Sequence, residues 1–155
     1  MEDIAIEDVA FADRCETVVQ RFIEDSDDVT GCVAWLTNPR LLDALSRLQS
    51  TRIVVTADKV HNRTAAAALR RIGARQIGCA RGRFRALMHH KFLVRITDGQ
   101  PTHVLIGSYN FTRHSNNNIG ESLVVLRCTR TARRFADEVE RAMRGSRPIR
   151  GHASR

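Results

Sequence analysis

The chain has no run of 18 consecutive apolar residues, and this excludes a membrane-spanning helix of ordinary length. It also lacks the basic start of a secretory signal peptide, because Met1 is followed by Glu2 and Asp3. We therefore expect a cytoplasmic protein that does not act as a membrane component. With 155 residues and 43% hydrophobic side chains, the chain is long and apolar enough to fold as one globular domain.

The sequence has no CxxC pair, and its four cysteines are scattered. Such cysteines are typical of small buried side chains in a reducing compartment. Cys79 together with His89 and His90 has the residue types of a metal site, but the spacing matches no common zinc pattern. We therefore expect neither a metal nor a cofactor.

Acidic residues are absent between His61 and Thr97, a segment that contains nine basic residues. Ten of the seventeen acids lie in residues 1–28, which leaves a net charge of +16 from residue 29 onward. Such a field attracts polyanions, and nucleic acid is the partner that it favours, DNA in preference to RNA. Acidic membrane lipid is the alternative. The acidic residues 24–28 either form a solvated turn or cover the basic surface.

Apolar patterning predicts helices and strands that alternate along the chain. We expect helices over residues 5–24, 38–49, 62–72 and 129–143, and strands over 32–36, 52–56, 75–80 and a central, buried 121–127. Asn38 and Pro39 have the residue types of an N-cap and a first helical position. The sequence has no internal repeat. This alternation predicts an α/β fold with a mixed β-sheet flanked by helices on both faces.

The segment 88–121, MHHKFLVRITDGQPTHVLIGSYNFTRHSNNNIGE, carries the chemistry. His89 and Lys91 are two residues apart, so in a strand their side chains leave the same face. Asp98-Gly99 predicts a tight hairpin, which returns Ser108 and Asn110 toward them. An ammonium group and an amide suit the oxygens of a phosphate, and an imidazole can attack phosphorus or move a proton.

The combination of H-x-K, a strand, G-S-x-N-F-T and a later Asn and Glu resembles the phospholipase D superfamily, most closely its small nucleases with a single motif. This resemblance implies that His89 is the nucleophile and that Lys91 and Asn110 bind the phosphate. It implies that Ser108 is a supporting hydrogen-bonding residue and that Glu121 orients the imidazole of His89. It also implies an α/β/α sandwich.

The sequence departs from the family pattern in the hairpin. The position where the family has Asp is Ile96 here, Asp98 comes two residues late, and Gly107 comes a further two residues late. Two added residues on each arm preserve the direction of every side chain. We therefore predict a longer hairpin with Asp98 at its tip.

The chain contains one His-Lys motif, whereas the family's chemistry uses two histidines. The resemblance therefore implies a homodimer whose active site crosses the interface, a phosphohistidine intermediate and hydrolysis without a metal. We expect Arg81, Arg83 and Arg85 to bind substrate phosphates, although this segment also fits a plain surface loop. Tyr109 either packs or stacks on a base, and His90 faces away from His89.

The expected organisation is an acidic N-terminal helix and turn (1–28), a phospholipase D-like catalytic domain (29–144) and a basic flexible tail (145–155). A phosphodiesterase that acts on nucleic acid is the function that the motif and the charge favour together. A lipid phosphodiesterase with the same chemistry and a nucleic-acid-binding module with an impaired site are the two alternatives.

Overall fold

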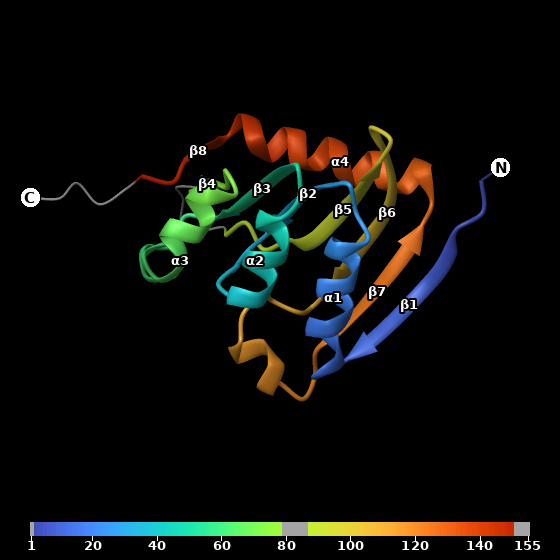
Figure 1. The fold of residues 1–155 in the computed structure, drawn as a ribbon, viewed down its shortest axis with the longest axis horizontal. Coiled ribbons are helices and arrows are strands. Elements are labelled where there is room, and N and C mark those ends of the chain that lie inside the picture. The colour runs from blue at the N-terminus through green and yellow to red at the C-terminus, as the bar shows by residue number, and fades with distance from the viewer. Residues whose placement is uncertain (1, 79–86, 151–155) are drawn as a thin grey trace, which may run out of the picture.

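The structure is a computed structural model that describes residues 2–78 and 87–150. In this part of the chain, one sheet of eight strands has the order β1-β7-β6-β5-β2-β3-β4-β8, and α-helices cover it (Figure 1). The strands are β1 (Ala5–Phe11), β2 (Asp28–Val33), β3 (Ser50–Thr56), β4 (Arg75–Ile77), β5 (Lys91–Thr97), β6 (Gln100–Gly107), β7 (Ser122–Arg127) and β8 (Ser146–Pro148). The helices are α1 (Arg14–Glu24), α2 (Pro39–Ser46), α3 (Lys59–Arg71), α4 (Thr129–Arg144) and the short 3-10 helix η1 (His114–Asn117).

The sheet is mixed, and helices pack on both of its faces. Strands β2, β3 and β4 are parallel to one another, and every other neighbouring pair is antiparallel. Successive side chains of β5 point to opposite faces: Leu93 packs with α1, α2 and α3, whereas Phe92 and Val94 pack with α4. The predicted fold class is confirmed.

The segment around Asp98 forms the predicted hairpin between β5 and β6. Asp98 and Gly99 have φ angles of 52° and 74°, the left-handed values that a two-residue type I′ turn requires. Residues Thr97 and Gln100 pair directly across this turn, and a register shift follows at Arg95 and Ile96. The four added residues thus lengthen the hairpin, as predicted, with one irregularity in the ladder.

The predicted helix over residues 5–24 is wrong in its first half, which forms the edge strand β1 on β7. A β-bulge between Ile6 and Asp8 explains the error. It inserts Glu7, so Ile6 and Val9 are three residues apart and yet lie on one face of the strand. Three-residue spacing of apolar side chains is also the signature of a helix. Only α1 (Arg14–Glu24) has the predicted conformation.

The structure also differs from the sequence-based expectation in the bounds of β2, in the position of β7 in the sheet and in the conformation of the C-terminal segment. Strand β2 begins at Asp28 and ends at Val33, before Trp35 and Leu36. Strand β7 is not central, because only β1 separates it from the edge of the sheet. Within the expected flexible tail, Ser146–Pro148 forms β8 on β4, where Arg75 donates hydrogen bonds to Ser146. Residues 151–155 lie outside the described part.

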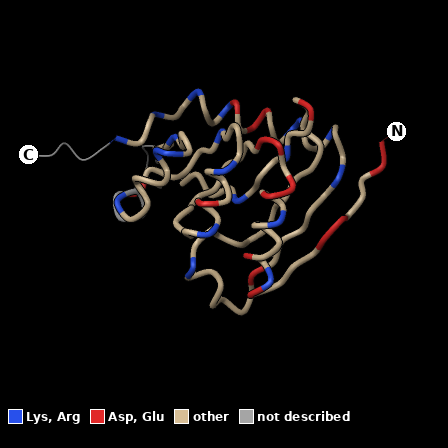
Figure 2. The backbone as a smooth tube through the Cα atoms, in the orientation of Figure 1, with Lys and Arg blue, Asp and Glu red and all other residues tan. Residues whose placement is uncertain are grey.

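Charge is distributed unevenly over the fold. Figure 2 shows acidic segments on β1 and near the β5–β6 turn, and basic residues along α4, on α3 and toward the C-terminus.

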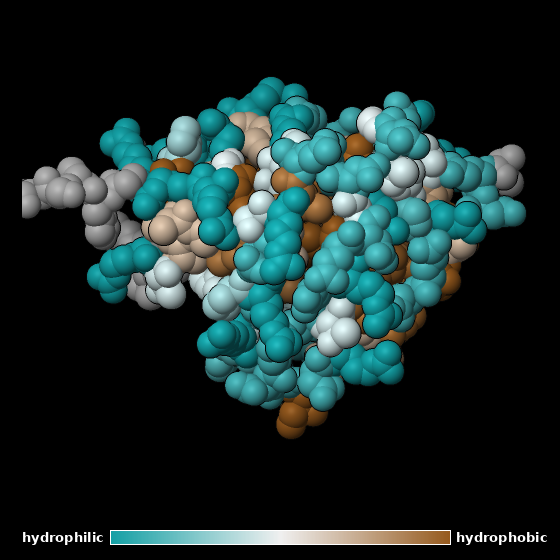
Figure 3. All heavy atoms as spheres, viewed as in Figure 1, coloured by the Kyte–Doolittle hydropathy of each residue, from teal (hydrophilic) through white to brown (hydrophobic). Residues whose placement is uncertain are grey.

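Polar residues cover most of the face seen in Figure 3, and apolar atoms emerge at the edge formed by β1. The side chains of Ile6, Val9 and Phe11 in β1 are exposed. Among the helices of the described residues, none is long and apolar enough to span a membrane.

Candidate active site

One end of the sheet collects the strand ends that carry the motif residues. Strand β2 ends beside the start of β5, because Val33 pairs with Lys91. Strand β6 ends at Gly107, which pairs with Leu123 at the start of β7. A Cβ atom on Gly107 would lie 2.0 Å from the Ser122 carbonyl oxygen, so only glycine allows these backbones to approach so closely. The residues before β5 and after β6 therefore emerge together.

His89 and Lys91 form the first pair in the site. Lys91 is 8% exposed, its Nζ donates to the His89 carbonyl oxygen at 2.9 Å, and Nζ lies 3.3 Å from each ring nitrogen of His89. The rings of His89 and Trp35 meet edge to face at 5.6 Å between centroids. Burial lowers the pKa of Lys91, and the nearby Glu121 carboxylate partly opposes this shift.

A second group of hydrogen bonds centres on Glu121, which is 9% exposed. Ser108 Oγ donates to Glu121 Oε2 at 2.7 Å, and Asn118 Nδ2 donates to Glu121 Oε1 at 2.7 Å. The Ser122 backbone N–H donates to Ser108 Oγ at 3.0 Å, so the Ser108 hydroxyl is held from both sides. Glu121 thereby fixes two other residues of the site and places a negative charge near Lys91.

Asn110 completes the set with an unusual feature. Its Oδ1 atom is buried and has no hydrogen-bond partner among the described residues. A buried acceptor without a partner is costly, so the surrounding structure holds Asn110 in this position at the expense of stability.

These side chains surround a cavity of about 600 Å³. All five residues that the sequence predicts as catalytic, His89, Lys91, Ser108, Asn110 and Glu121, line it together with Gly107, Asn118 and Gly120. A donor cation, a hydroxyl, an amide and an imidazole on one small cavity suit an anion with several oxygens, such as a phosphate ester.

Comparison with known protein families assigns the chain to one of them. A family model described as cardiolipin synthase, PLD-like domain, matches residues 19–143. The chain belongs to this PLD-like family.

Solved structures with the PLD-like fold resemble the chain closely in three dimensions. Nuc from Salmonella typhimurium, a phospholipase D family member, has a TM-score of 0.77 at 19% identity, over 96% of this chain and 100% of that one. NucT from Helicobacter pylori also has a TM-score of 0.77, at 13% identity, over 94% and 99% of the two chains. TrmBL2, an archaeal chromatin protein, has a TM-score of 0.57 at 11% identity, over 96% and 55%. No curated protein matches the chain. At these identities the likeness shows the fold alone.

One residue of the PLD-like motif is placed differently from the expectation. Glu121 is predicted to orient the imidazole of His89, but its carboxylate oxygens accept from Ser108 and Asn118, and no hydrogen bond of the described residues joins Glu121 to His89. Asn118, three residues before Glu121, donates to the oxygen that Ser108 leaves open. Asn118 is a site residue that sequence reasoning missed, because asparagines in a polar segment are typical of turns.

Of the four residues predicted to contact the substrate, the structure describes only Tyr109. Tyr109 is 1% exposed and its hydroxyl donates to Asn116 Oδ1 at 2.6 Å, so it packs in the core, the first of the two roles expected for it. Arg81, Arg83 and Arg85, like Cys79, lie outside the described residues.

His90 faces α4, as its parity predicts. Its Nε2 lies 3.0 Å from Glu138 Oε1, and its ring meets Phe92 edge to face at 5.3 Å between centroids. His90 is therefore an exposed neighbour of the PLD-like site that faces α4 and not the cavity.

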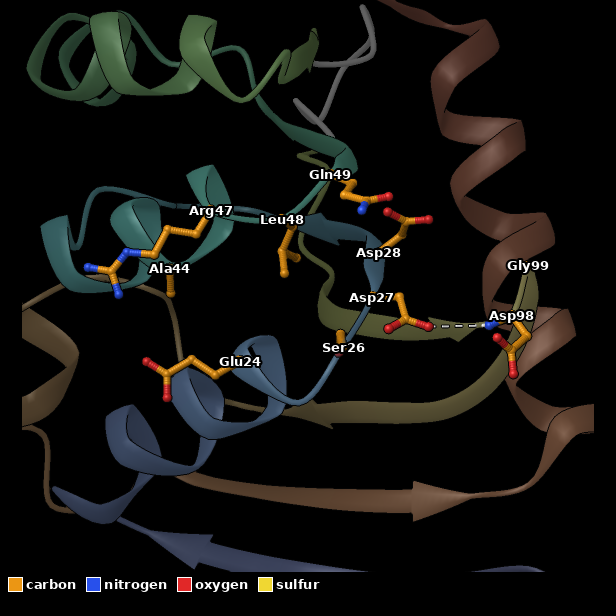
Figure 4. Close-up of a pocket in the computed structure, with 10 residues that line it drawn as sticks. All are labelled: Glu24, Ser26, Asp27, Asp28, Ala44, Arg47, Leu48, Gln49, Asp98 and Gly99. Carbon is orange, nitrogen blue, oxygen red and sulfur yellow. Dashed lines mark hydrogen bonds between the residues drawn. The ribbon is translucent and has the colours of Figure 1, made fainter.

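Asp98 lies at the opposite end of β5, about 23 Å from Lys91 by the rise of a seven-residue strand. There it lines an acidic hollow of about 550 Å³ with the turn at residues 24–28 (Figure 4). Its backbone N–H points to Asp27 Oδ2 at 3.4 Å. This acidic turn lies at the start of β2, whereas the cavity lies at the end of β2. The turn therefore does not cover the cavity.

Proposed function

We propose that the chain is a phosphodiesterase that hydrolyses nucleic-acid phosphodiester bonds, with DNA preferred to RNA. The observation that carries this proposal is the cavity in which His89, Lys91 and Asn110 meet on a PLD-like fold. The net charge of +16 from residue 29 onward supports a polyanionic substrate, because a basic surface attracts and steers nucleic acid.

The reaction follows from the residues in two steps. A ring nitrogen of His89 attacks phosphorus, the bond from phosphorus to the leaving oxygen breaks, and a phosphohistidine forms. A second imidazole protonates the leaving oxygen. The same imidazole then removes a proton from water, and the resulting hydroxide attacks phosphorus, which frees His89 and releases the phosphate ester. Lys91 and Asn110 stabilise the charge on the phosphoryl oxygens throughout.

The second imidazole comes from another copy of the chain in this proposal. His90 is turned toward α4 and bound to Glu138, so it is not available to the cavity. A two-fold dimer would bring His89 of the partner subunit opposite the first His89 and double the cationic groups around the phosphate. Because imidazole and ammonium groups do all of this work, we propose that hydrolysis needs no metal.

A lipid phosphodiesterase is the alternative that the family description favours. The exposed apolar side chains of β1 are a possible contact with lipid, but Glu2, Asp3, Glu7 and Asp8 lie among them. Acidic side chains repel an anionic lipid surface. We therefore place nucleic acid first.

The deciding experiment is a cleavage assay in EDTA with labelled single- and double-stranded DNA and RNA, and with vesicles of phosphatidylglycerol in parallel. We expect the wild-type protein and the His90→Ala variant to cut nucleic acid, and we expect His89→Ala to lose at least about a thousandfold in rate. His90→Ala is a matched control, because it removes the neighbouring imidazole on the opposite face. Salt-sensitive binding without any cutting would instead indicate a nucleic-acid-binding module without activity. Hydrolysis of the lipid alone would indicate that the substrate is a lipid and not nucleic acid.

A further inference from the structure

The loop between β6 and β7 presents Ser108, Asn110, Asn118 and Glu121 to the cavity, and η1 is its one regular element. Catalysis requires that such side chains be held to a fraction of an ångström, since a misplacement of about 1 Å can cost about a hundredfold in rate. Something outside the loop must therefore fix its position.

Glu16 of α1 provides this connection. Its Oε2 atom accepts hydrogen bonds from Asn116 Nδ2 in the loop, at 2.5 Å, and from Asn38 Nδ2 at the start of α2, at 2.6 Å. Its Oε1 atom accepts from Arg40 Nη1 at 3.1 Å. Asn116 in turn accepts at Oδ1 from the hydroxyl of the buried Tyr109, the neighbour of Asn110. One carboxylate thus joins α1, α2 and both halves of the loop.

The charge of Glu16 is essential to this arrangement. Its side chain is 14% exposed, and burial raises the pKa of the carboxyl, but hydrogen bonds from Asn116, Asn38 and Arg40 outweigh burial and lower it below its ordinary value. The carboxylate is therefore ionised, and it accepts from three donors. Burial, together with the charge of Glu16, also raises the pKa of Tyr109, so the phenol keeps the proton that it donates to Asn116.

A second contact ties the same N-terminal segment to the end of the loop. The Ala12 backbone N–H donates to the Glu121 carbonyl oxygen at 2.9 Å, and Ala12 has a φ of 50°. Ala12 and Glu16 both precede the residues 19–143 that the family model matches. Both residues thus lie on the N-terminal side of the matched range.

We propose that Glu16 is a positioning residue that holds the β6–β7 loop, and with it Asn110 and Asn118, in the geometry that the reaction needs. This inference rests on the proposed phosphodiesterase function. Glu16 does not line the cavity, so it acts on the rate through the loop and not by contact with the substrate.

The test is a donor–acceptor exchange between Glu16 and Asn116. Glu16→Gln places an amide against two amide donors and the Arg40 guanidinium, so at least one bond is lost. Asn116→Asp places a second carboxylate against Glu16. The double variant, Glu16→Gln with Asn116→Asp, lets the glutamine amide donate to the new carboxylate, which still accepts from Tyr109. Glu24→Gln is the control, because Glu24 lies on the same helix, is exposed and bonds only Gln20 among the described residues.

We expect Glu16→Gln to lower kcat on the preferred nucleic acid by about ten- to hundredfold with KM within about threefold, at a temperature where circular dichroism shows it folded. Asn116→Asp should be at least as impaired, the double variant should recover most of kcat, and Glu24→Gln should match wild type. A purely structural Glu16 would lower the melting temperature without changing kcat at that temperature. That result, or a double variant without recovery, would overturn the proposal.

Hydrogen exchange separates this proposal from the function on which it rests. The amides of residues 109–118 should exchange faster in Glu16→Gln than in wild type, and the double variant should restore their protection. If neither wild type nor Glu24→Gln cuts any substrate, the phosphodiesterase proposal fails, and exchange alone decides whether Glu16 holds the loop. If these amides exchange at the wild-type rate in Glu16→Gln, the positioning role is excluded, whatever the activity of the variant.

Discussion

Only 8% of Lys91 is exposed. Burial of its ammonium group lowers the free energy of unfolding, because the charge loses its hydration. Because burial lowers its pKa in the folded protein, the unfolded chain binds the proton of Lys91 more tightly. Below the folded pKa of Lys91, the charge therefore reduces the free energy of unfolding. This cost declines as pH rises through the folded pKa, and it is gone above the ordinary pKa of lysine, where the side chain is neutral in both states.

Replacement of this side chain should separate activity from stability. We expect Lys91→Met to abolish phosphodiester hydrolysis and to raise the melting temperature by about 2–4 °C, the effect of about 1 kcal/mol in a chain of this size. Thermal unfolding at neutral pH, followed by circular dichroism, measures the shift. Lys91→Arg keeps the charge and should not raise the melting temperature. A lower melting temperature for Lys91→Met would show that the ammonium stabilises the fold.

The sequence predicts the residues that line the cavity better than it predicts the residues that hold them in place. His89, Lys91, Ser108 and Asn110 are recognisable because their types suit a phosphate and because the Asp98-Gly99 turn predicts that the two ends of the hairpin meet. Glu16 carries no such signal, because it lies 100 residues from its partner Asn116. Contacts at that separation follow from packing and not from local pattern.

The hairpin of β5 and β6 is the element in which the chain departs from the family pattern. Asp98 sits at its tip with a φ of 52° and faces Asp27 and Asp28 across the acidic hollow (Figure 4). Asp98 does not line the cavity that the five motif residues share. Its conformation means that it acts on stability, since asparagine and aspartate tolerate left-handed backbone better than most residues.

Substitutions at the tip should therefore change stability and leave the rate unaltered. We expect Asp98→Asn to raise the free energy of unfolding by about 0.5 kcal/mol, since Asn-Gly is the preferred type I′ pair and one acid is removed from the hollow. Asp98→Ala should lower it by about 1 kcal/mol. Urea unfolding measures both, and kcat should stay within about twofold of wild type. A tenfold loss of kcat in both variants would return Asp98 to the mechanism.

The hairpin and β1 show why one element was predictable and the other was not. The turn residues of the hairpin determine its type locally, so Asp98-Gly99 sufficed. In β1, a bulge gives Ile6 and Val9 a helical spacing, and the strand exists because β7 pairs with it. Pairing with a distant strand overrides a local pattern whenever the backbone finds its hydrogen bonds there.

At the scale of the whole molecule, the proposed reaction needs two imidazoles, whereas each chain contributes one His-Lys pair. If two copies share one site, each active dimer needs two intact His89 residues. Chains of wild type and His89→Ala, refolded together in equal amounts, should then retain about a quarter of the wild-type activity, because only dimers of two wild-type chains are active.

The control for this experiment mixes the two proteins after each has refolded, where half of the activity should remain. Light scattering of the His89→Ala protein should still report a dimer, since the variant alters the site and not the fold. Retention of half the activity in the co-refolded sample would indicate one independent site in each chain and contradict the shared site.

The sequence by itself determined the sheet-and-helix alternation, the tight turn, the five residues that face one cavity and the basic character of the chain. These properties depend on local periodicity, on turn chemistry and on charge, all of which are written in short stretches of residues. Only the tertiary structure decided that residues 5–11 join the sheet, that Asn118 and Ser108 share Glu121, that Tyr109 is core and that Glu16 anchors the loop. Each of these depends on which distant segments meet, and that is decided by burial and by the cost of leaving buried polar groups without partners.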